Sequence, residues 1–269
     1  MKTIKKTLII SFVLACNLNV IGQDYSKQES VQLPTFDGLA KEYLPTKVEF
    51  PSIDGLIVNG NLYEVGNDKP VILLCHSASS NRIEYADIAP KLNELGYNCM
   101  AIDQRVGGEL AEKSNETSLR AKKDKFPTDY IDAQQDIEAA INYLTKKFNK
   151  KIIVWGSSYS SSLVLFESLQ NEKVKASISF SPADYFGDKK QSLKVIFPEL
   201  KKPFFITSSK QEATILSALV DVNKLKENQI QFVPQSNGFH GSKALWNGQR
   251  GAEEYWIAVI EFLTLIKNN

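Results

Sequence analysis

Short apolar runs alternate with amphipathic stretches along most of the chain from Val71 onward. A short apolar run is typical of a buried strand, whereas apolar residues at helical spacing indicate one face of a helix. The alternation therefore predicts an α/β fold, with βα units around a mostly parallel sheet. The expected strands of these units are Val71 to Cys75, Asn98 to Ile102, one that ends at Trp155, Val174 to Phe180, Phe204 to Ser208 and Ile230 to Val233.

The segments around these strands complete the expected architecture. Upstream, Val48 to Phe50 and Leu56 to Tyr63 flank a turn and predict an antiparallel hairpin. Residues 105 to 130 are polar and show no period, so they form either a solvated connection or a loop across the active site. Helices with one apolar face are expected over Tyr85 to Leu95, Ile137 to Phe148 and Trp256 to Ile266.

The first residues have the pattern of a secretory signal peptide. Lysines at positions 2, 5 and 6 precede an apolar stretch from Leu8 to Val20, which is typical of an exported protein. The pattern predicts a signal over residues 1–22, cleavage after Gly22, a polar arm over residues 23–44 and one domain over residues 45–269. The protein is then expected in the periplasm or outside the cell.

The same segment has a second interpretation as a lipoprotein signal. Val13-Leu14-Ala15-Cys16 resembles a bacterial lipobox, and lipidation of Cys16 would anchor the protein to a membrane. We favour simple cleavage because the residues after Cys16 stay largely apolar through Ile21. A membrane span takes about 20 apolar residues, and no segment reaches that length, so no stable span is expected.

The composition argues against several classes of protein. The net charge is +1 and no basic patch stands out, so nucleic acid is not an expected partner. Two histidines far apart and no Cys-x-x-Cys pair predict no metal site, and no glycine-rich phosphate loop is present. Cys75 and Cys99 fall in expected strands, where cysteine usually serves as a small apolar residue, although a disulfide between them stays open.

The most informative motif is a serine between small residues. Ser158 stands in Gly156-Ser157-Ser158-Tyr159-Ser160, after an expected strand and before a helix-like stretch. A sharp strand-to-helix turn projects a hydroxyl free of the backbone, and small residues on both sides let strand and helix approach closely. The pattern is G-x-S-x-S, with Ser160 in place of the usual second glycine. It predicts that Ser158 is a nucleophile.

A histidine near the C-terminus supplies the base that such a serine needs. His240 lies in a glycine-flanked loop, and the chain order nucleophile, acid, histidine is that of α/β-hydrolases. His240 is therefore the expected general base. The acid that orients it is expected at Glu212, after the strand Phe204 to Ser208, with Asp184 after the preceding strand as the alternative.

These motifs together resemble the dienelactone-hydrolase-like group of α/β-hydrolases, over residues 45 to 266. The resemblance implies a sheet of about eight strands, no cofactor and acyl transfer to water through a serine ester. It also implies an oxyanion hole built from backbone N–H groups of Ser77 or Ala78 and of Tyr159, with His76 shaping the first loop. The residues that carry it are Leu74-Cys75-His76-Ser77-Ala78, Ala101 to Arg105 with Gly107-Gly108, the Ser158 elbow, Ser181-Pro182, the Glu212 loop and His240-Gly241.

Two departures from the group bear on the substrate. Namesake dienelactone hydrolases carry cysteine at the elbow, and Ser158 in its place favours general hydrolysis of a small-molecule carboxylic ester. The acid would be Glu212 rather than the commoner aspartate. A peptidase or amidase on the same triad stays open, as does a non-catalytic descendant that binds a ligand, because substrate-binding loops vary on a shared fold.

Overall fold

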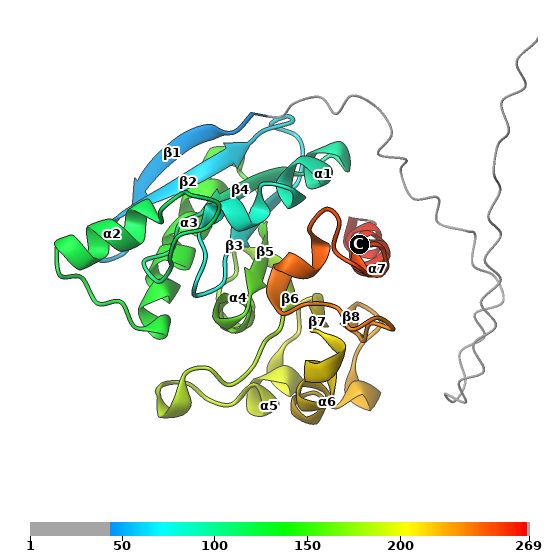
Figure 1. Ribbon diagram of the computed structural model, residues 1–269. Helices are drawn as coiled ribbons and strands as arrows, with labels where there is room; N and C mark the ends of the chain where they lie inside the picture. The colour runs from blue at the N-terminus through cyan, green and yellow to red at the C-terminus, as the bar shows by residue number, and fades with distance from the viewer. Residues whose placement is uncertain (1–43, 268–269) are drawn as a thin grey trace, which may run out of the picture. The chain divides into compact units, whose positions relative to one another are not determined.

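Eight strands form one sheet in the computed structural model, which describes residues 44–267 (Figure 1). The strands are β1 (Thr46–Pro51), β2 (Ile57–Tyr63), β3 (Val71–Cys75), β4 (Asn98–Ile102), β5 (Ile152–Ser157), β6 (Val174–Phe180), β7 (Phe204–Thr207) and β8 (Gln229–Phe232). Their order is β1-β2-β4-β3-β5-β6-β7-β8; β2 is antiparallel to β1 and β4, and the other neighbouring pairs are parallel. The expected hairpin and mostly parallel sheet are confirmed, and β3, β4 and β6 have the predicted ends. The signal segment, Cys16 and all but the last residue of the arm lie outside the described residues.

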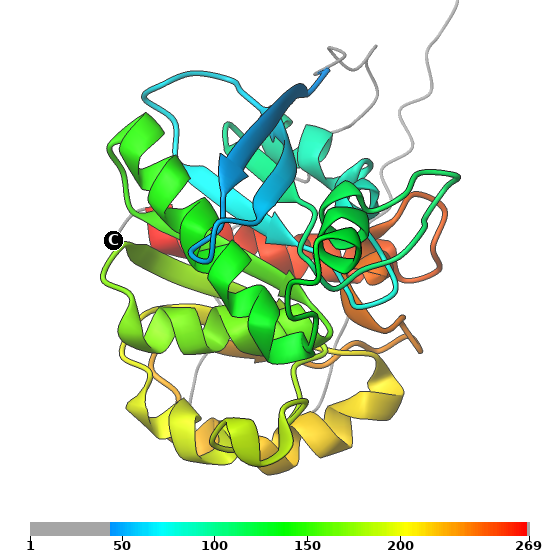
Figure 2. The ribbon, with the colours of Figure 1, turned by 90° about the vertical axis from the view of Figure 1, so that its left-hand side faces the viewer.

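Helices cover both faces of this sheet (Figure 2). They are α1 (Ile88–Glu94), α2 (Glu116–Lys123), α3 (Gln134–Phe148), α4 (Tyr159–Gln170), α5 (Leu193–Ile196), α6 (Lys210–Leu219) and α7 (Ala252–Lys267). α1 and α7 pack on one face, and α3, α4, α5 and α6 on the other. The apolar faces expected for α3 and α7 are buried as predicted, whereas Tyr85 lies in a 3-10 turn before α1. In the described part of the chain, none of the helices is long and apolar enough to cross a membrane.

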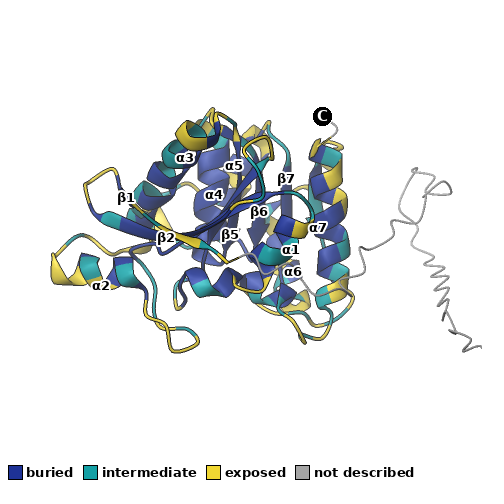
Figure 3. Cartoon of the chain, turned by 90° about the horizontal axis from the view of Figure 1, so that it is seen from above, coloured by how far each residue is buried: buried dark blue, intermediate teal, exposed yellow. Residues whose placement is uncertain are grey.

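The central strands are buried on both faces, which explains why their sequences are continuous apolar runs (Figure 3). Successive side chains of a strand point to opposite faces. Cys75 accordingly packs in the core under α3 and α4, and Cys99 in the core under α1 and α7. Both thiols are buried and free, and burial raises the pKa of each. The disulfide that the sequence left open is therefore not formed.

The polar connection between β4 and α3 is more ordered than the sequence predicts. We expected no element between residues 105 and 130, but α2 forms there, and Asn115 caps it by accepting a hydrogen bond from Ser118 N at 2.7 Å. α2 buries small and polar side chains, so it has no apolar stripe. Arg105 is fully buried and pairs with Asp54 at 2.7 Å and Asp136 at 2.8 Å. The start of this connection is thus part of the core.

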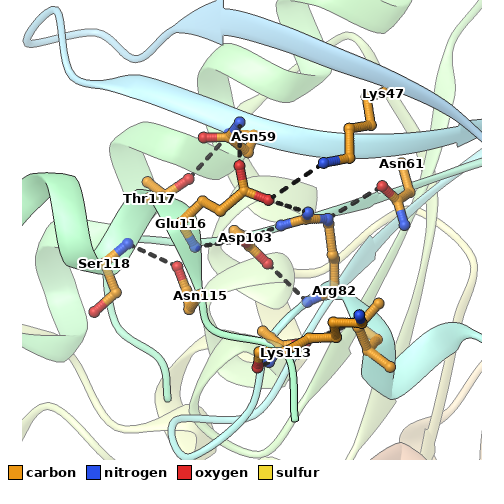
Figure 4. A network of polar contacts seen from close by, with 12 residues as sticks. Lys47, Asn59, Asn61, Arg82, Asp103, Lys113, Asn115, Glu116, Thr117 and Ser118 are labelled. Atoms are coloured by element: carbon orange, nitrogen blue, oxygen red, sulfur yellow. Dashed lines mark hydrogen bonds and ion pairs between the residues drawn. The ribbon is translucent and has the colours of Figure 1, made fainter. Parts of the chain in front are cut away.

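A second charge network, buried at Arg82 and Asp103 and open to solvent at its other end, centres on Arg82 (Figure 4). Its guanidinium contacts the carboxylates of Asp103 and Glu116 and donates to Asn61 Oδ1 at 3.1 Å. Glu116 N donates to Asp103 Oδ2 at 2.9 Å, and Lys47 Nζ lies 3.8 Å from Glu116 Oε1. The network joins β1, β2, the end of β4 and α2. It fixes the outer hairpin to α2 and to the end of β4.

Candidate active site

Ser158 stands on a sharp turn between β5 and α4. Its backbone has φ +58° and ψ −128°, which places a non-glycine residue in a strained conformation. A Cβ at Gly156 would lie 2.4 Å from the Ser160 carbonyl oxygen, so only glycine fits before the turn. Ser160, in place of the second glycine, donates its hydroxyl to the Cys75 carbonyl at 2.8 Å and accepts from Ser157 N at 2.9 Å. The hydrogen bond to Cys75 therefore fixes the turn of Ser158 to the neighbouring strand β3.

His240 and Glu212 form a short contact beside this turn. His240 Nδ1 lies 2.5 Å from Glu212 Oε1. The second carboxylate oxygen, Oε2, accepts hydrogen bonds from Ser181 Oγ at 2.9 Å and from Ser209 N and Oγ at 3.1 and 2.9 Å. Glu212 is thus also the third-position residue of the capping box that begins α6. Asp184, the alternative acid, is exposed and accepts from Ser192 and Leu193 instead.

This contact changes how both groups titrate. Burial acts to raise the pKa of Glu212, but the hydrogen bond and charge of His240, with the bonds from Ser209 and Ser181, lower it to about 2. The Glu212 hydrogen bond raises the pKa of His240 above its ordinary value, against partial burial. With Nδ1 held by the carboxylate, Nε2 is the nitrogen left for proton transfer.

The loop that carries His240 is fastened to the elbow. Ser242 N donates to Ser157 Oγ at 2.9 Å. A Cβ at Gly241 would lie 2.4 Å from Ser157 Oγ and 3.9 Å from Ser158 N, so this loop passes directly against the turn. Gly241 has φ +71°, which favours glycine. Ser158, Glu212 and His240 therefore follow the carboxyl ends of β5, β7 and β8, the edge at which open parallel sheets place their ligands. Within residues 44–267, His240 is hydrogen-bonded to Glu212, and no hydrogen bond joins it to Ser158 Oγ.

The three residues expected to supply oxyanion N–H groups are not equivalent. Ser77 N donates to Glu84 Oε2 at 3.0 Å, and Ser77 Oγ donates to the same oxygen at 2.9 Å, so this N–H is engaged. The N–H of Ala78 makes no hydrogen bond within residues 44–267. Tyr159 is the first residue of α4, where N–H groups lack intrahelical partners. Ala78 and Tyr159 are thus the two donors left for a ligand oxygen.

His76 holds the first of these loops in place, as expected. Its side chain is buried, with Nδ1 2.7 Å from the Ser77 carbonyl oxygen and Nε2 accepting from Gln104 N at 3.0 Å. Burial lowers the pKa of His76. With both ring nitrogens engaged, His76 has none left to move a proton at Ser158.

Two residues at the site escaped the sequence analysis. Glu84 is fully buried beneath the loop after β3, and its Oε1 has no hydrogen-bond partner among the described residues. Tyr185, in the loop after β6, donates its hydroxyl to the Ser181 carbonyl at 2.8 Å. Glu84 lies in a short 3-10 turn and Tyr185 in a loop, and neither belongs to a motif with fixed spacing. The only signal for Tyr185 was its closeness in sequence to Ser181-Pro182.

Solved structures with this fold are α/β-hydrolases. An esterase from Pyrococcus furiosus is 18% identical, with a TM-score of 0.59 over 82% of this chain and 91% of its own. A dienelactone hydrolase from Anabaena variabilis is 16% identical, with a TM-score of 0.59 over 82% of this chain and 98% of its own. An acylaminoacyl peptidase from Pyrococcus horikoshii is 16% identical, with a TM-score of 0.57 over 82% of this chain and 41% of its own.

The sequence identifies the family as well as the fold. The model of the dienelactone hydrolase family matches residues 58–263, and the chain belongs to this family of hydrolases. No curated protein matches the chain significantly.

Proposed function

We propose that this hydrolase cleaves carboxylic esters of small molecules through a serine ester, with Ser158 as nucleophile, His240 as base and Glu212 as the acid that orients it. The observation that carries the proposal is the 2.5 Å contact between His240 and Glu212, on a loop that packs against the strained turn of Ser158. A nucleophile beside a base that is itself oriented by a third group is the arrangement that activates a hydroxyl.

The reaction follows from these positions. Ser158 Oγ attacks the ester carbonyl carbon while His240 Nε2 takes the hydroxyl proton, and the carbonyl oxygen becomes an oxyanion that the N–H groups of Ala78 and Tyr159 stabilise. The C–O bond to the alcohol then breaks as His240 returns its proton to the leaving oxygen. A water molecule attacks the acyl group with His240 again as base, which releases the acid and restores Ser158. Glu212 stabilises the imidazolium in both halves.

The match to the dienelactone hydrolase family and the likeness to an esterase support an ester substrate. The leaving group of a small ester is an alcohol. The half-exposed His240 side chain, with 48% of its surface accessible, can deliver a proton to that leaving oxygen. The matching set of nucleophile, base and acid also argues against a purely binding role, because binding alone does not require all of them.

Labelling with a fluorophosphonate tests the nucleophile directly. We expect one phosphonyl adduct per chain, located by peptide mass spectrometry at Ser158, because the probe reacts only with an activated hydroxyl. Ser162→Ala is the matched control, since this α4 serine bonds to the Ala183 carbonyl at 2.8 Å away from the turn, and it should label like the wild type. Folded wild-type protein that stays unlabelled would favour the binding descendant.

We also propose that the protein works outside the cytoplasm, on the lysines and apolar stretch of residues 1–22. Fractionation of cells that express the full chain should recover labelled protein in the periplasm or the medium if cleavage follows Gly22. If Cys16 is lipidated, the protein should be in the membrane pellet, and Cys16→Ala should release it. Uncleaved protein in the cytosol would contradict export.

A further inference from the structure

We infer that the cavity between Tyr130 and Tyr185 is the substrate subsite of this enzyme and that it takes an aromatic ring of the ester. The inference rests on the proposed function, since it assigns the part of the substrate that Ser158 does not attack. The cavity measures about 400 Å³ and is lined by Thr128, Asp129, Tyr130, Ile131, Tyr185, Phe186 and Lys189. This volume is within the range of small-molecule sites.

Two of its walls adjoin the candidate active site. The Tyr185 hydroxyl donates to the Ser181 carbonyl at 2.8 Å, and Ser181 Oγ donates to Glu212 Oε2 at 2.9 Å. The Tyr130 ring lies 4.9 Å from the Tyr159 ring, centroid to centroid, and Tyr159 carries one of the two free oxyanion N–H groups. A group that fills the cavity therefore lies beside the loop of Ser181, which holds Glu212, and beside the ring of Tyr159, which directly follows Ser158.

The side chains that line the cavity determine which substrate group binds there. Tyr130 has 42% of its surface exposed and offers a ring that is not covered by the core, while Tyr185 is packed edge-on against Phe186 with centroids 6.5 Å apart. Aromatic rings attract each other in offset or edge-to-face arrangements more strongly than they attract an aliphatic chain of equal area. Walls of this kind favour a planar aryl group over a flexible acyl chain.

An ion pair joins the two walls at the surface. Lys189 Nζ, after β6, lies 2.6 Å from Asp129 Oδ2, just before Tyr130. Both side chains are more than half exposed, so the pair adds little stability, but it connects the loop of Tyr185 to the loop of Tyr130. The ion pair therefore links the two loops whose separation sets the width of the cavity.

A second cavity near the site fits a substrate less well. It measures about 610 Å³ and is lined by residues 209–212 and 237–240, which include Glu212 and His240. Besides the His240 imidazole, this lining offers an aryl group one ring, that of Phe239, whereas Tyr130, Tyr185 and Phe186 line the first cavity. Its exposed aromatic residue, Phe239, has 40% of its surface accessible and is therefore a matched control for Tyr130.

Hydrolysis of three esters tests the inference: ethyl cinnamate, with the ring in the acyl part; phenethyl acetate, with the ring in the alcohol part; and ethyl octanoate, with no ring. We expect the wild type to prefer one of the two aryl esters in kcat/KM, which also shows which part of the ester enters the cavity. Tyr130→Leu and Tyr185→Leu should reduce the ratio of aryl to aliphatic kcat/KM by about three- to tenfold, because one ring contact is lost. Tyr185→Phe keeps the ring, and Phe239→Leu changes the other cavity, so both should keep the ratio.

Binding to a variant without turnover separates this inference from the proposed function. Ser158→Ala should still bind the preferred aryl ester, measured by saturation-transfer NMR, and adding Tyr130→Leu to it should weaken that binding by a similar factor. Ester hydrolysis with no aryl preference, or a preference lost in Phe239→Leu and kept in Tyr130→Leu, would overturn the subsite. Binding of the aryl ester that Tyr130→Leu weakens, with no hydrolysis of any ester by the wild type, would keep the cavity and overturn the ester hydrolase.

Discussion

Ser158→Ala is expected to leave a folded protein whose kcat on p-nitrophenyl acetate falls by about 10⁴ to 10⁶. The change removes only the oxygen that forms the ester bond, at a residue that is 8% exposed on the turn before α4. His240→Ala should cost about as much, and the double variant little more, because nucleophile and base act as one unit. Initial rates on purified proteins, corrected for uncatalysed hydrolysis, measure the effect.

The strained backbone of Ser158 provides a control for folding. At φ +58°, Ser158→Ala keeps the backbone strain of the wild type, whereas Ser158→Gly relieves it. The glycine variant should therefore unfold at a somewhat higher temperature than the alanine variant and be equally inactive. Turnover at the wild-type rate in either variant would exclude Ser158 as the nucleophile.

Glu212→Gln is expected to lower kcat by about 10⁴, since an amide presents the wrong hydrogen-bonding pattern to His240 Nδ1 and cannot stabilise the imidazolium. Glutamine still suits the capping box, so α6 should form. Only neutral His240 accepts a proton, so activity rises with pH through the His240 pKa. Glu212 raises that pKa, and its removal should move the acidic limb of kcat/KM to lower pH.

Asp184→Asn is the matched comparison for the acid. Among the described residues, Asp184 accepts hydrogen bonds only from Ser192 and Leu193, so its variant should keep both the rate and the pH profile of the wild type. A pH profile of kcat/KM for each variant decides between the two carboxylates. Loss of turnover in Asp184→Asn with Glu212→Gln unaffected would reverse the assignment.

The sequence predicts the sheet well because burial on both faces leaves a continuous apolar run. β3, β4 and β6 could be located to the residue for this reason. α2 could not, because it buries Thr117, Ser118 and Ala121 in place of an apolar stripe. Arg82 and Arg105 order this region by pairing with carboxylates that are distant in the sequence. No local sequence pattern indicates such ion pairs.

In the candidate site, too, some residues could be predicted from the sequence and others could not. Ser158 follows from a local turn, and His240 from chain order and the small number of histidines. The engagement of Ser77 N by Glu84 depends on how an irregular loop folds back, and so does the contact of the Tyr185 hydroxyl with the Ser181 carbonyl. Contacts of this kind have neither a period nor a spacing, so the sequence could propose the reacting groups but not the surface that holds the substrate.

The buried position of Arg105 bears on the order in which the chain folds. Its carboxylate partners come from the turn after β1, 51 positions earlier, and from α3, 31 positions later. Until both carboxylates are in place, the guanidinium is buried away from water without its full set of charged partners. A missing partner costs about 3–5 kcal/mol of folding free energy. Natural domains have only about 5–15 kcal/mol of total stability. The β1–β2 hairpin, although it lies at the edge of the sheet, is therefore coupled to the central strands through Asp54, and a truncation that removes it should take away a large share of the stability of the domain.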